Sequence, residues 1–145
     1  METLKKSAIV LFVICATNYF AHSQDAKIIQ NAFAKSYIHE SGYEYAKAID
    51  EIKKVYTADN YYQNLRLGWL NYLAGQHKES IKYYQTAIGI MPYSIEAKLG
   101  YIYPTSTLGN WEQVKVQYEE ILKIDEKNFT ANYNSGLIYY NKKEY

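Results

Sequence analysis

The sequence is poor in the residues that build reactive centres and covalent cross-links. It contains one cysteine, Cys15, and three histidines among 145 residues. A single thiol forms no intrachain disulfide. No set of His, Cys and carboxylate residues has the spacing of a zinc site, and no glycine-rich phosphate loop or nucleophile motif is present. We therefore expect no catalytic residue, no metal ligand and no cofactor, and we predict that the protein is not an enzyme.

Arginine is equally scarce, and positive charge is not concentrated anywhere. Arg66 is the only arginine, and the 16 basic side chains are balanced by 15 acidic ones. A chain without a basic patch lacks the electrostatic footprint of a nucleic-acid-binding protein, so we expect no nucleic-acid partner. Neighbouring carboxylates such as Glu119 and Glu120 point to different sides of a helix, which indicates solvated faces.

Long apolar runs are absent except near the N-terminus. Two lysines precede an apolar run over 8–16, and small residues follow at the two positions that a signal peptidase reads. This pattern predicts a secretory signal peptide over residues 1–23, cleaved near Ser23 and Gln24, and hence an exported protein, periplasmic or extracellular. An uncleaved membrane helix is the alternative. It is disfavoured because Asn18 interrupts the run, which is shorter than the ~20 residues that span a bilayer.

The rest of the chain has helical periodicity. Apolar residues recur three and four positions apart, as at Ile81, Tyr84 and Ile88, which places them on one helix face. The pattern predicts helices near 27–40, 43–57, 60–74, 77–90, 95–107, 111–124 and 129–142.

Glycine and proline punctuate these helices. Gly42, Gly75 and Gly109 fall where a helix ends and the chain reverses, so we expect them to take positive φ. Pro92 is predicted to end the helix before it. Pro104 lies inside a predicted helix, where a proline removes a hydrogen bond, and we expect a kink there.

The pattern repeats with a period of 34 residues. Three columns of equivalent positions are Ala34, Gly68, Ile102, Gly136; Ala46, Ser80, Val114; and Tyr43, His77, Trp111, Tyr145. The small residues Ala34, Gly68 and Gly136 are predicted to let paired helices approach closely. His77 falls among aromatic residues and is predicted to pack in their place. A fixed period of this length indicates stacked units, each of which buries its apolar face against its neighbours.

Residues 61–94 resemble the tetratricopeptide repeat (TPR) family in Leu67-Gly68, Gly75, Ser80, Tyr84, Ala87 and Pro92. They depart from it at Asn64 and Asn71, where large apolar residues are usual. The resemblance implies an all-α fold, an α-solenoid of stacked antiparallel helix pairs (a TPR superhelix) with about 3.5 repeats. The repeats are predicted over 27–60, 61–94 and 95–128, and the first helix of a fourth, truncated or serving as a cap, over 129–145.

In TPR arrays the first helices of successive repeats line a concave groove that holds peptides. By this resemblance the predicted partner-binding residues are Tyr62, Leu65, Trp69, Tyr72, Leu99, Tyr103, Tyr133 and Tyr140. The remaining groove positions are Glu96, Ser106, Thr130 and Leu137, with Ile28, Asn31, Lys35 and Ile38 from the first repeat. Chaperone-binding TPR domains hold a C-terminal carboxylate with a clamp of Lys and Asn residues. Here Lys35 and Arg66 are the only cations at those positions and Glu96 opposes them, so we do not expect that partner class.

We predict a protein–protein interaction scaffold in the cell envelope that binds a protein or peptide partner through this aromatic groove. One alternative is a sensory or docking segment of a longer multidomain protein, such as a sensor kinase or an enzyme. Another is a glycan-binding module, because stacked aromatic rings also suit sugars. The partner's identity and the oligomeric state stay open. Asn128-Phe129-Thr130 matches a glycosylation acceptor, but its position at the start of a predicted helix favours a capping role.

Overall fold

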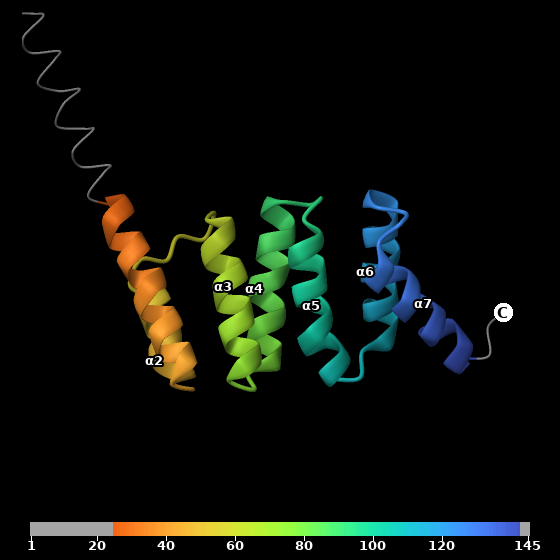
Figure 1. Cartoon of the computed structure of the whole chain (residues 1–145), viewed down its shortest axis with the longest axis horizontal. Helices are drawn as coiled ribbons and strands as arrows, with labels where there is room; N and C mark the ends of the chain where they lie inside the picture. Colours follow the sequence, from red (N-terminus) through yellow and green to blue (C-terminus); the bar gives the residue numbers. More distant parts are fainter. Residues whose placement is uncertain (1–24, 143–145) are drawn as a thin grey trace, which may run out of the picture.

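The computed structural model describes residues 25–142, and this part of the chain folds into helices without a strand (Figure 1). The predicted signal peptide and Tyr145 lie outside the described residues. The helices are the first helix (25–41), α2 (Tyr45–Lys53), α3 (Tyr61–Leu73), α4 (His77–Ile90), α5 (Ile95–Thr107), α6 (Trp111–Ile124) and α7 (Phe129–Lys142). The all-α prediction is confirmed, and the last four helices have the predicted bounds.

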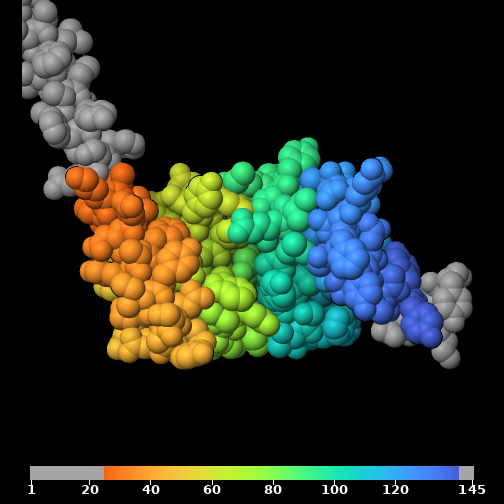
Figure 2. Space-filling model, in the orientation of Figure 1, coloured from red at the N-terminus to blue at the C-terminus, as the bar shows by residue number. Residues whose placement is uncertain are grey.

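Consecutive helices pack against each other as antiparallel neighbours, and the pairs stack along one axis (Figure 1). α3 also contacts α5 directly, although α4 lies between them in the sequence. The first helix, α3, α5 and α7 therefore lie on one face of the stack, which faces the viewer in Figure 2. This is the predicted α-solenoid of stacked helix pairs.

The apolar core is divided into clusters between neighbouring helices. Ile52, Leu67 and Leu70 are fully buried in the N-terminal part, and Ile121 and Ala131 are fully buried in the C-terminal part. Each cluster draws on at least two helix pairs, because no pair has enough apolar surface to form a core by itself. Stacking therefore supplies the hydrophobic stabilisation.

Glycines end two of the helices as expected. Gly75 and Gly109 have φ values of 73° and 75°, which glycine adopts without steric cost. The prediction for Gly42 is wrong, because the positive φ in the first turn, 58°, belongs to Tyr43. The first helix continues to residue 41, so the left-handed residue that ends it comes later than the period predicts.

The 34-residue period does not hold in α2. Ala46 and Asp50 fall on the buried columns of that period but are exposed, whereas Ala48 and Ile52 are fully buried. Burying the Ile52 side chain is favourable by about 1.5–3 kcal/mol, whereas an unpaired buried Asp50 carboxylate costs more than that. The helix therefore buries Ala48 and Ile52, each two positions after the residue that the 34-residue period predicts to be buried.

The same shift of two residues applies to the first helix. Ala34, predicted to be the small residue at the helix contact, is exposed, and Ser36 is fully buried instead. Ser36 and Gly68 are thus the equivalent positions, 32 residues apart. The assignment of Gly136 is also wrong, because a Cβ atom there would meet nothing within 4 Å. Only Gly68 among the three has the predicted role.

Asn64, one of the two departures of α3 from the family pattern, holds the turn that precedes the helix together with Gln63. Asn64 is fully buried, and its amide donates to the carbonyl oxygens of Ala58 and Asn60 at 3.0 and 2.8 Å. Gln63, also fully buried, donates to the Val55 carbonyl at 3.0 Å. These amides satisfy backbone groups of the loop over 54–60, so polar residues replace apolar ones at no desolvation cost.

α5 continues through Pro104 to Thr107. Proline has no N–H to donate to the preceding turn, but hydroxyl groups around it bond the nearby carbonyls. Thr105 donates to the Tyr101 carbonyl at 2.6 Å and Thr107 to the Tyr103 carbonyl at 2.9 Å. Hydroxyl bonds of this kind tend to bend a helix, and they do not replace the bond to the Gly100 carbonyl that Pro104 cannot make. The kink expected at this position stays a prediction.

Tyr84 lies between α3 and α5, at the place where these helices come closest. A Cβ atom on Gly68 would lie 2.9 Å from its ring, and one on Gly100 only 2.2 Å. Real Cβ atoms do not approach ring carbons so closely. The two glycines are therefore required by the ring of Tyr84, which is 3% exposed.

Tyr84 also predicts a loss of stability at alkaline pH. Burial first, and then the Glu96 carboxylate, raise the pKa of its hydroxyl from the ordinary 10.0. Above pH 10 the unfolded chain loses this proton while the folded protein keeps it. The free energy of unfolding should therefore fall by about 1.4 kcal/mol per pH unit for this group. Below pH 10 the group contributes no pH dependence.

Urea denaturation at several pH values between 9 and 11.5 measures this effect. In Tyr84→Phe, the fall in the free energy of unfolding above pH 10 should be smaller by the contribution of this one hydroxyl, because phenylalanine does not titrate. The substitution removes no hydrogen bond, since the hydroxyl makes none with another described residue. Tyr61 and Tyr118 also have raised pKa values from burial and should keep their shares in the variant. An identical pH dependence in the two proteins would contradict the assignment to Tyr84.

Candidate functional site

The face formed by the first helix, α3 and α5 contains a cavity of about 890 Å³. Aromatic and apolar side chains dominate its lining, which also includes an arginine and two glutamates. The lining residues are Phe33, Tyr37, Glu40, Tyr62, Leu65, Arg66, Trp69, Tyr84, Ile95, Glu96, Leu99, Gly100 and Tyr103. We call this cavity the concave groove. Successive turns of three parallel helices line it, so each helix contributes residues three and four apart.

Three aromatic rings on α3 and α5 form a contiguous surface beside the groove. The ring centroids of Trp69 and Tyr72 are 5.8 Å apart, and those of Tyr72 and Tyr103 are 5.7 Å apart. Trp69 and Tyr103 meet edge to face at 6.3 Å. His77 packs against Tyr72 at 5.7 Å, in keeping with its predicted aromatic role. Such contacts hold the rings rigidly, so a ligand that stacks on them costs them little conformational entropy.

Arg66 is buried in the floor of the concave groove, where it is 6% exposed. Its Nη1 lies 2.5 Å from Oε2 of Glu40, and its Nε donates to the Ser36 hydroxyl at 3.0 Å. The guanidinium also lies under the Tyr37 ring, 3.8 Å from its centroid. Glu40 in turn accepts a 2.7 Å hydrogen bond from Trp69 Nε1. One carboxylate thus neutralises the arginine and orients the tryptophan.

The net charge of the groove lining is negative. Glu40 balances Arg66, which leaves the Glu96 carboxylate at the start of α5 without an opposite charge in the lining. Among residues 25–142, no ion pair includes Glu96. An anionic ligand would be repelled by the Glu96 carboxylate. Arg66 would attract it little, because Glu40 already neutralises that charge. The groove is therefore suited to neutral or basic segments.

Solved structures share this arrangement of helices. The first TPR of Spaghetti (RPAP3) bound to an HSP90 peptide matches with a TM-score of 0.70 at 16% identity, over 81% of this chain and 94% of that one. A tetratricopeptide repeat protein from Parabacteroides merdae matches with a TM-score of 0.75 at 20% identity, over 81% and 48% of the two chains. The chain has the TPR fold.

A third structure, of the TPR protein YrrB, is described as having an unusual peptide-binding site. It matches with a TM-score of 0.65 at 20% identity, over 78% of this chain and 59% of that one. No protein-family model matches the sequence, and neither does any curated protein. The TPR fold is thus recognised from the shape of the chain, at sequence identities of 20% or less to these structures.

Five of the eight predicted site residues line the concave groove of this TPR domain: Tyr62, Leu65, Trp69, Leu99 and Tyr103. Tyr72 contacts two of them through its ring. The structure does not bring Tyr133 and Tyr140 to this cavity. They are 58% and 68% exposed on α7, where Tyr133 stacks on Phe129 with centroids 6.0 Å apart.

The first-repeat positions predicted for the groove are wrong. Ile28, Asn31, Lys35 and Ile38 are exposed and do not line it, whereas Phe33, Tyr37 and Glu40 do. The cause is again the shift of two residues in the first repeat. The signal was present in the sequence, because this shift aligns the aromatic Tyr37 with Trp69 and the small Ser36 with Gly68.

Other site types find no support within residues 25–142. No group of three or more His, Cys, Asp or Glu side chains there could hold a metal ion. No helix in that range is long and apolar enough to cross a bilayer. Asn128 caps α7, because its side-chain oxygen accepts a 3.1 Å hydrogen bond from the Ala131 amide.

Proposed function

We propose that this protein is an exported scaffold that binds a peptide segment of a partner protein in its concave groove. The single observation that carries the proposal is the groove itself, a cavity of about 890 Å³ that three parallel helices line with aromatic rings. Large rigid aromatic side chains that stay accessible on a folded protein are the residues that dominate protein–protein binding energies.

The exposure of these rings supports a binding role over a packing role. Tyr37, Tyr62 and Tyr103 are 56%, 68% and 50% exposed, although each lines the groove. A ring that serves only the core would be covered by its own chain. A partner segment that covers them would remove apolar area from water, which is favourable by about 25 cal/mol per Å².

Two of the similar structures are described in terms of peptide binding, which supports the same role here. The HSP90 peptide bound to the Spaghetti domain is SRMEEVD, an acidic sequence. We do not propose an acidic partner for this protein, because Glu40 neutralises Arg66 and Glu96 adds negative charge. A neutral or basic segment rich in apolar side chains fits the lining better.

Export is the second part of the proposal. Its support is the N-terminal sequence, in which two lysines, an apolar run and small residues at 21 and 23 follow one another as in a signal peptide. Intact mass of the protein isolated from its native source tests this part. A chain that begins near Gln24 is the expected result, and a chain that retains residues 1–23 would contradict cleavage.

A displayed library of random peptides tests the binding role. We expect the protein to enrich peptides with apolar and aromatic residues and few acidic ones. Trp69→Ala and Tyr103→Ala should each weaken the selected peptides about 30-fold, because truncating a central aromatic residue costs about 2 kcal/mol. Fluorescence anisotropy of a labelled peptide measures the affinity, and circular dichroism verifies that each variant is folded.

Tyr93→Ala is the matched control. Tyr93 is 83% exposed in the turn between α4 and α5 and does not line the groove. Its removal deletes an accessible aromatic ring elsewhere, so the affinity should not change. If Trp69→Ala and Tyr103→Ala bind the selected peptides as tightly as this control does, the groove is not the binding site.

A further inference from the structure

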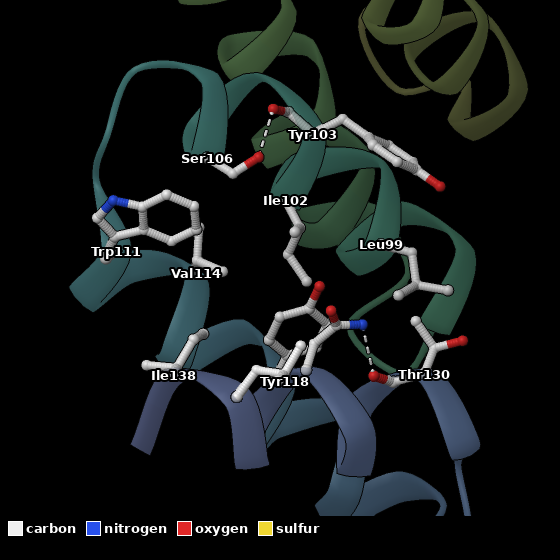
Figure 3. A pocket seen from close by; sticks show the side chains of 11 residues that line it. Leu99, Ile102, Tyr103, Ser106, Trp111, Val114, Tyr118, Thr130 and Ile138 are labelled. Atoms are coloured by element: carbon white, nitrogen blue, oxygen red, sulfur yellow. Dashed lines mark hydrogen bonds between the residues drawn. The ribbon is translucent and has the colours of Figure 1, made fainter. Parts of the chain in front are cut away.

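A second cavity, of about 670 Å³, lies between α5, α6 and α7 (Figure 3). Its floor is formed by buried residues of the C-terminal core, and its rim by half-exposed residues of α5 and α7. The lining residues are Leu99, Ile102, Tyr103, Ser106, Trp111, Val114, Tyr118, Thr130, Asn134, Leu137 and Ile138. Leu99 and Tyr103 also line the concave groove, so the two cavities are neighbours on opposite sides of α5.

The cavity exists because the contact around Tyr84 is not repeated. Tyr118 occupies the position equivalent to Tyr84, but the residues equivalent to Gly68 and Gly100 are Ile102 and Asn134. Their side chains occupy the space that the ring of Tyr84 uses one repeat earlier. α7 accordingly does not pack on α5 as α5 packs on α3, and the space between them stays open.

The lining of this cavity is chemically selective. None of its residues is charged, so a charged ligand would lose its hydration there without gaining an ion pair. Most of the walls are aliphatic or aromatic. The polar residues at the rim are in part satisfied already, since Ser106 donates to the Tyr103 carbonyl and Asn134 to the Thr130 carbonyl. Size and lining together are those of a small-molecule site, for which volumes run from about 300 to 1,000 Å³.

Tyr118 places a hydrogen-bond donor on the floor of the cavity. Tyr118 is 7% exposed, and its hydroxyl makes no hydrogen bond with another described residue. Figure 3 shows this hydroxyl directed from the floor toward the α5 residues that line the opposite wall. Burial raises its pKa, so the hydroxyl keeps its proton at neutral pH. A ligand that covers this hydroxyl must supply an acceptor in place of water, because a buried donor without a partner costs free energy.

We propose that this cavity binds a small, neutral, mostly apolar molecule with one hydrogen-bond acceptor, which accepts a hydrogen bond from Tyr118 Oη. The absence of charge in the lining selects a neutral ligand, and the Tyr118 hydroxyl on the floor supplies a donor for its acceptor. This site is separate from peptide binding in the concave groove and does not depend on that function.

Two neutral fluorescent probes test the proposal. Prodan, 6-propionyl-2-(dimethylamino)naphthalene, carries one carbonyl acceptor, whereas N-phenyl-1-naphthylamine is of similar size and has no carbonyl. We expect both to bind the protein saturably at one site per chain. Tyr118→Phe deletes only the hydroxyl and should weaken prodan about three- to tenfold, the effect of one hydrogen bond. It should leave the binding of N-phenyl-1-naphthylamine unchanged.

Two further variants test which of the two cavities binds the probes. Ser106→Phe, at the half-buried rim, should fill the cavity and block both probes. Tyr62→Ala lies in the concave groove and outside this cavity, so it should change neither affinity. The proposal is overturned if the wild type binds neither probe saturably, or if Tyr118→Phe weakens both equally. It is also overturned if Tyr62→Ala abolishes binding that Ser106→Phe leaves intact.

Discussion

Replacing Glu40 with leucine is expected to destabilise the protein by about 3–5 kcal/mol. The change leaves the guanidinium of Arg66 buried at 6% exposure without its counter-ion. It also removes the acceptor of the Trp69 indole. Removing one partner of a buried pair costs far more than the pair contributes, because the remaining charge stays desolvated and uncompensated.

Urea denaturation of Glu40→Leu, Arg66→Met and the double variant measures this effect. The double variant should recover most of the loss, since no unpaired charge is left in the floor of the groove. Glu79→Leu is the control, because Glu79 pairs with the exposed Lys82 and such surface pairs contribute about 1 kcal/mol or less. Equal destabilisation by Glu40→Leu and Glu79→Leu would contradict the role of Arg66.

Gly100→Ala is expected to destabilise the protein by about 1–3 kcal/mol, the usual cost of overpacking. An added Cβ atom would lie 2.2 Å from the Tyr84 ring, so the ring or a helix must move. The sign is informative, because alanine within a helix is otherwise more favourable than glycine by about 1 kcal/mol. The packing of α3, α5 and Tyr84 thus outweighs helix propensity at this position.

Gly136→Ala provides the matched control. Gly136 also lies within a helix, α7, but an added Cβ would meet nothing within 4 Å, so this change should stabilise the protein by about 0.5–1 kcal/mol. Thermal or urea denaturation of both variants gives the comparison. In a Tyr84→Val background, Gly100→Ala should lose most of its cost. A stabilising Gly100→Ala, or a cost that persists without the ring, would show that the close contact is not the cause.

Local sequence signals sufficed for most of the fold. α4, α5, α6 and α7 have the predicted bounds, because Gly75, Gly109 and Pro92 end helices through backbone constraints that act within a few residues. The first repeat was placed incorrectly for a different reason. A period of 34 residues implies repeats of equal length. Ser36 and Gly68 occupy equivalent places but are only 32 residues apart.

The groove was predicted only in part. Helical spacing and the family resemblance identified Trp69 and Tyr103, since groove positions follow from the register of each helix. The same reasoning missed Tyr37 and Glu40, because a shift of two residues rotates a helix by about 200° and exchanges its faces. Arg66 was considered only as an element of a carboxylate clamp. Its pairing with Glu40 joins residues from different helices, which no local pattern reports.

That this chain is a stack of helix pairs can be read from the sequence, because helix periodicity, capping and a repeating small residue are local properties. The sequence also indicates that the groove is aromatic and poor in positive charge. The differences between the repeats follow from contacts between helices, which the sequence does not reveal. The nesting of Tyr84 between Gly68 and Gly100 draws α3 and α5 together, while Ile102 and Asn134 keep α7 away and open the cavity at Tyr118. Such differences depend on side chains that meet across three helices, and packing that close responds to single atoms.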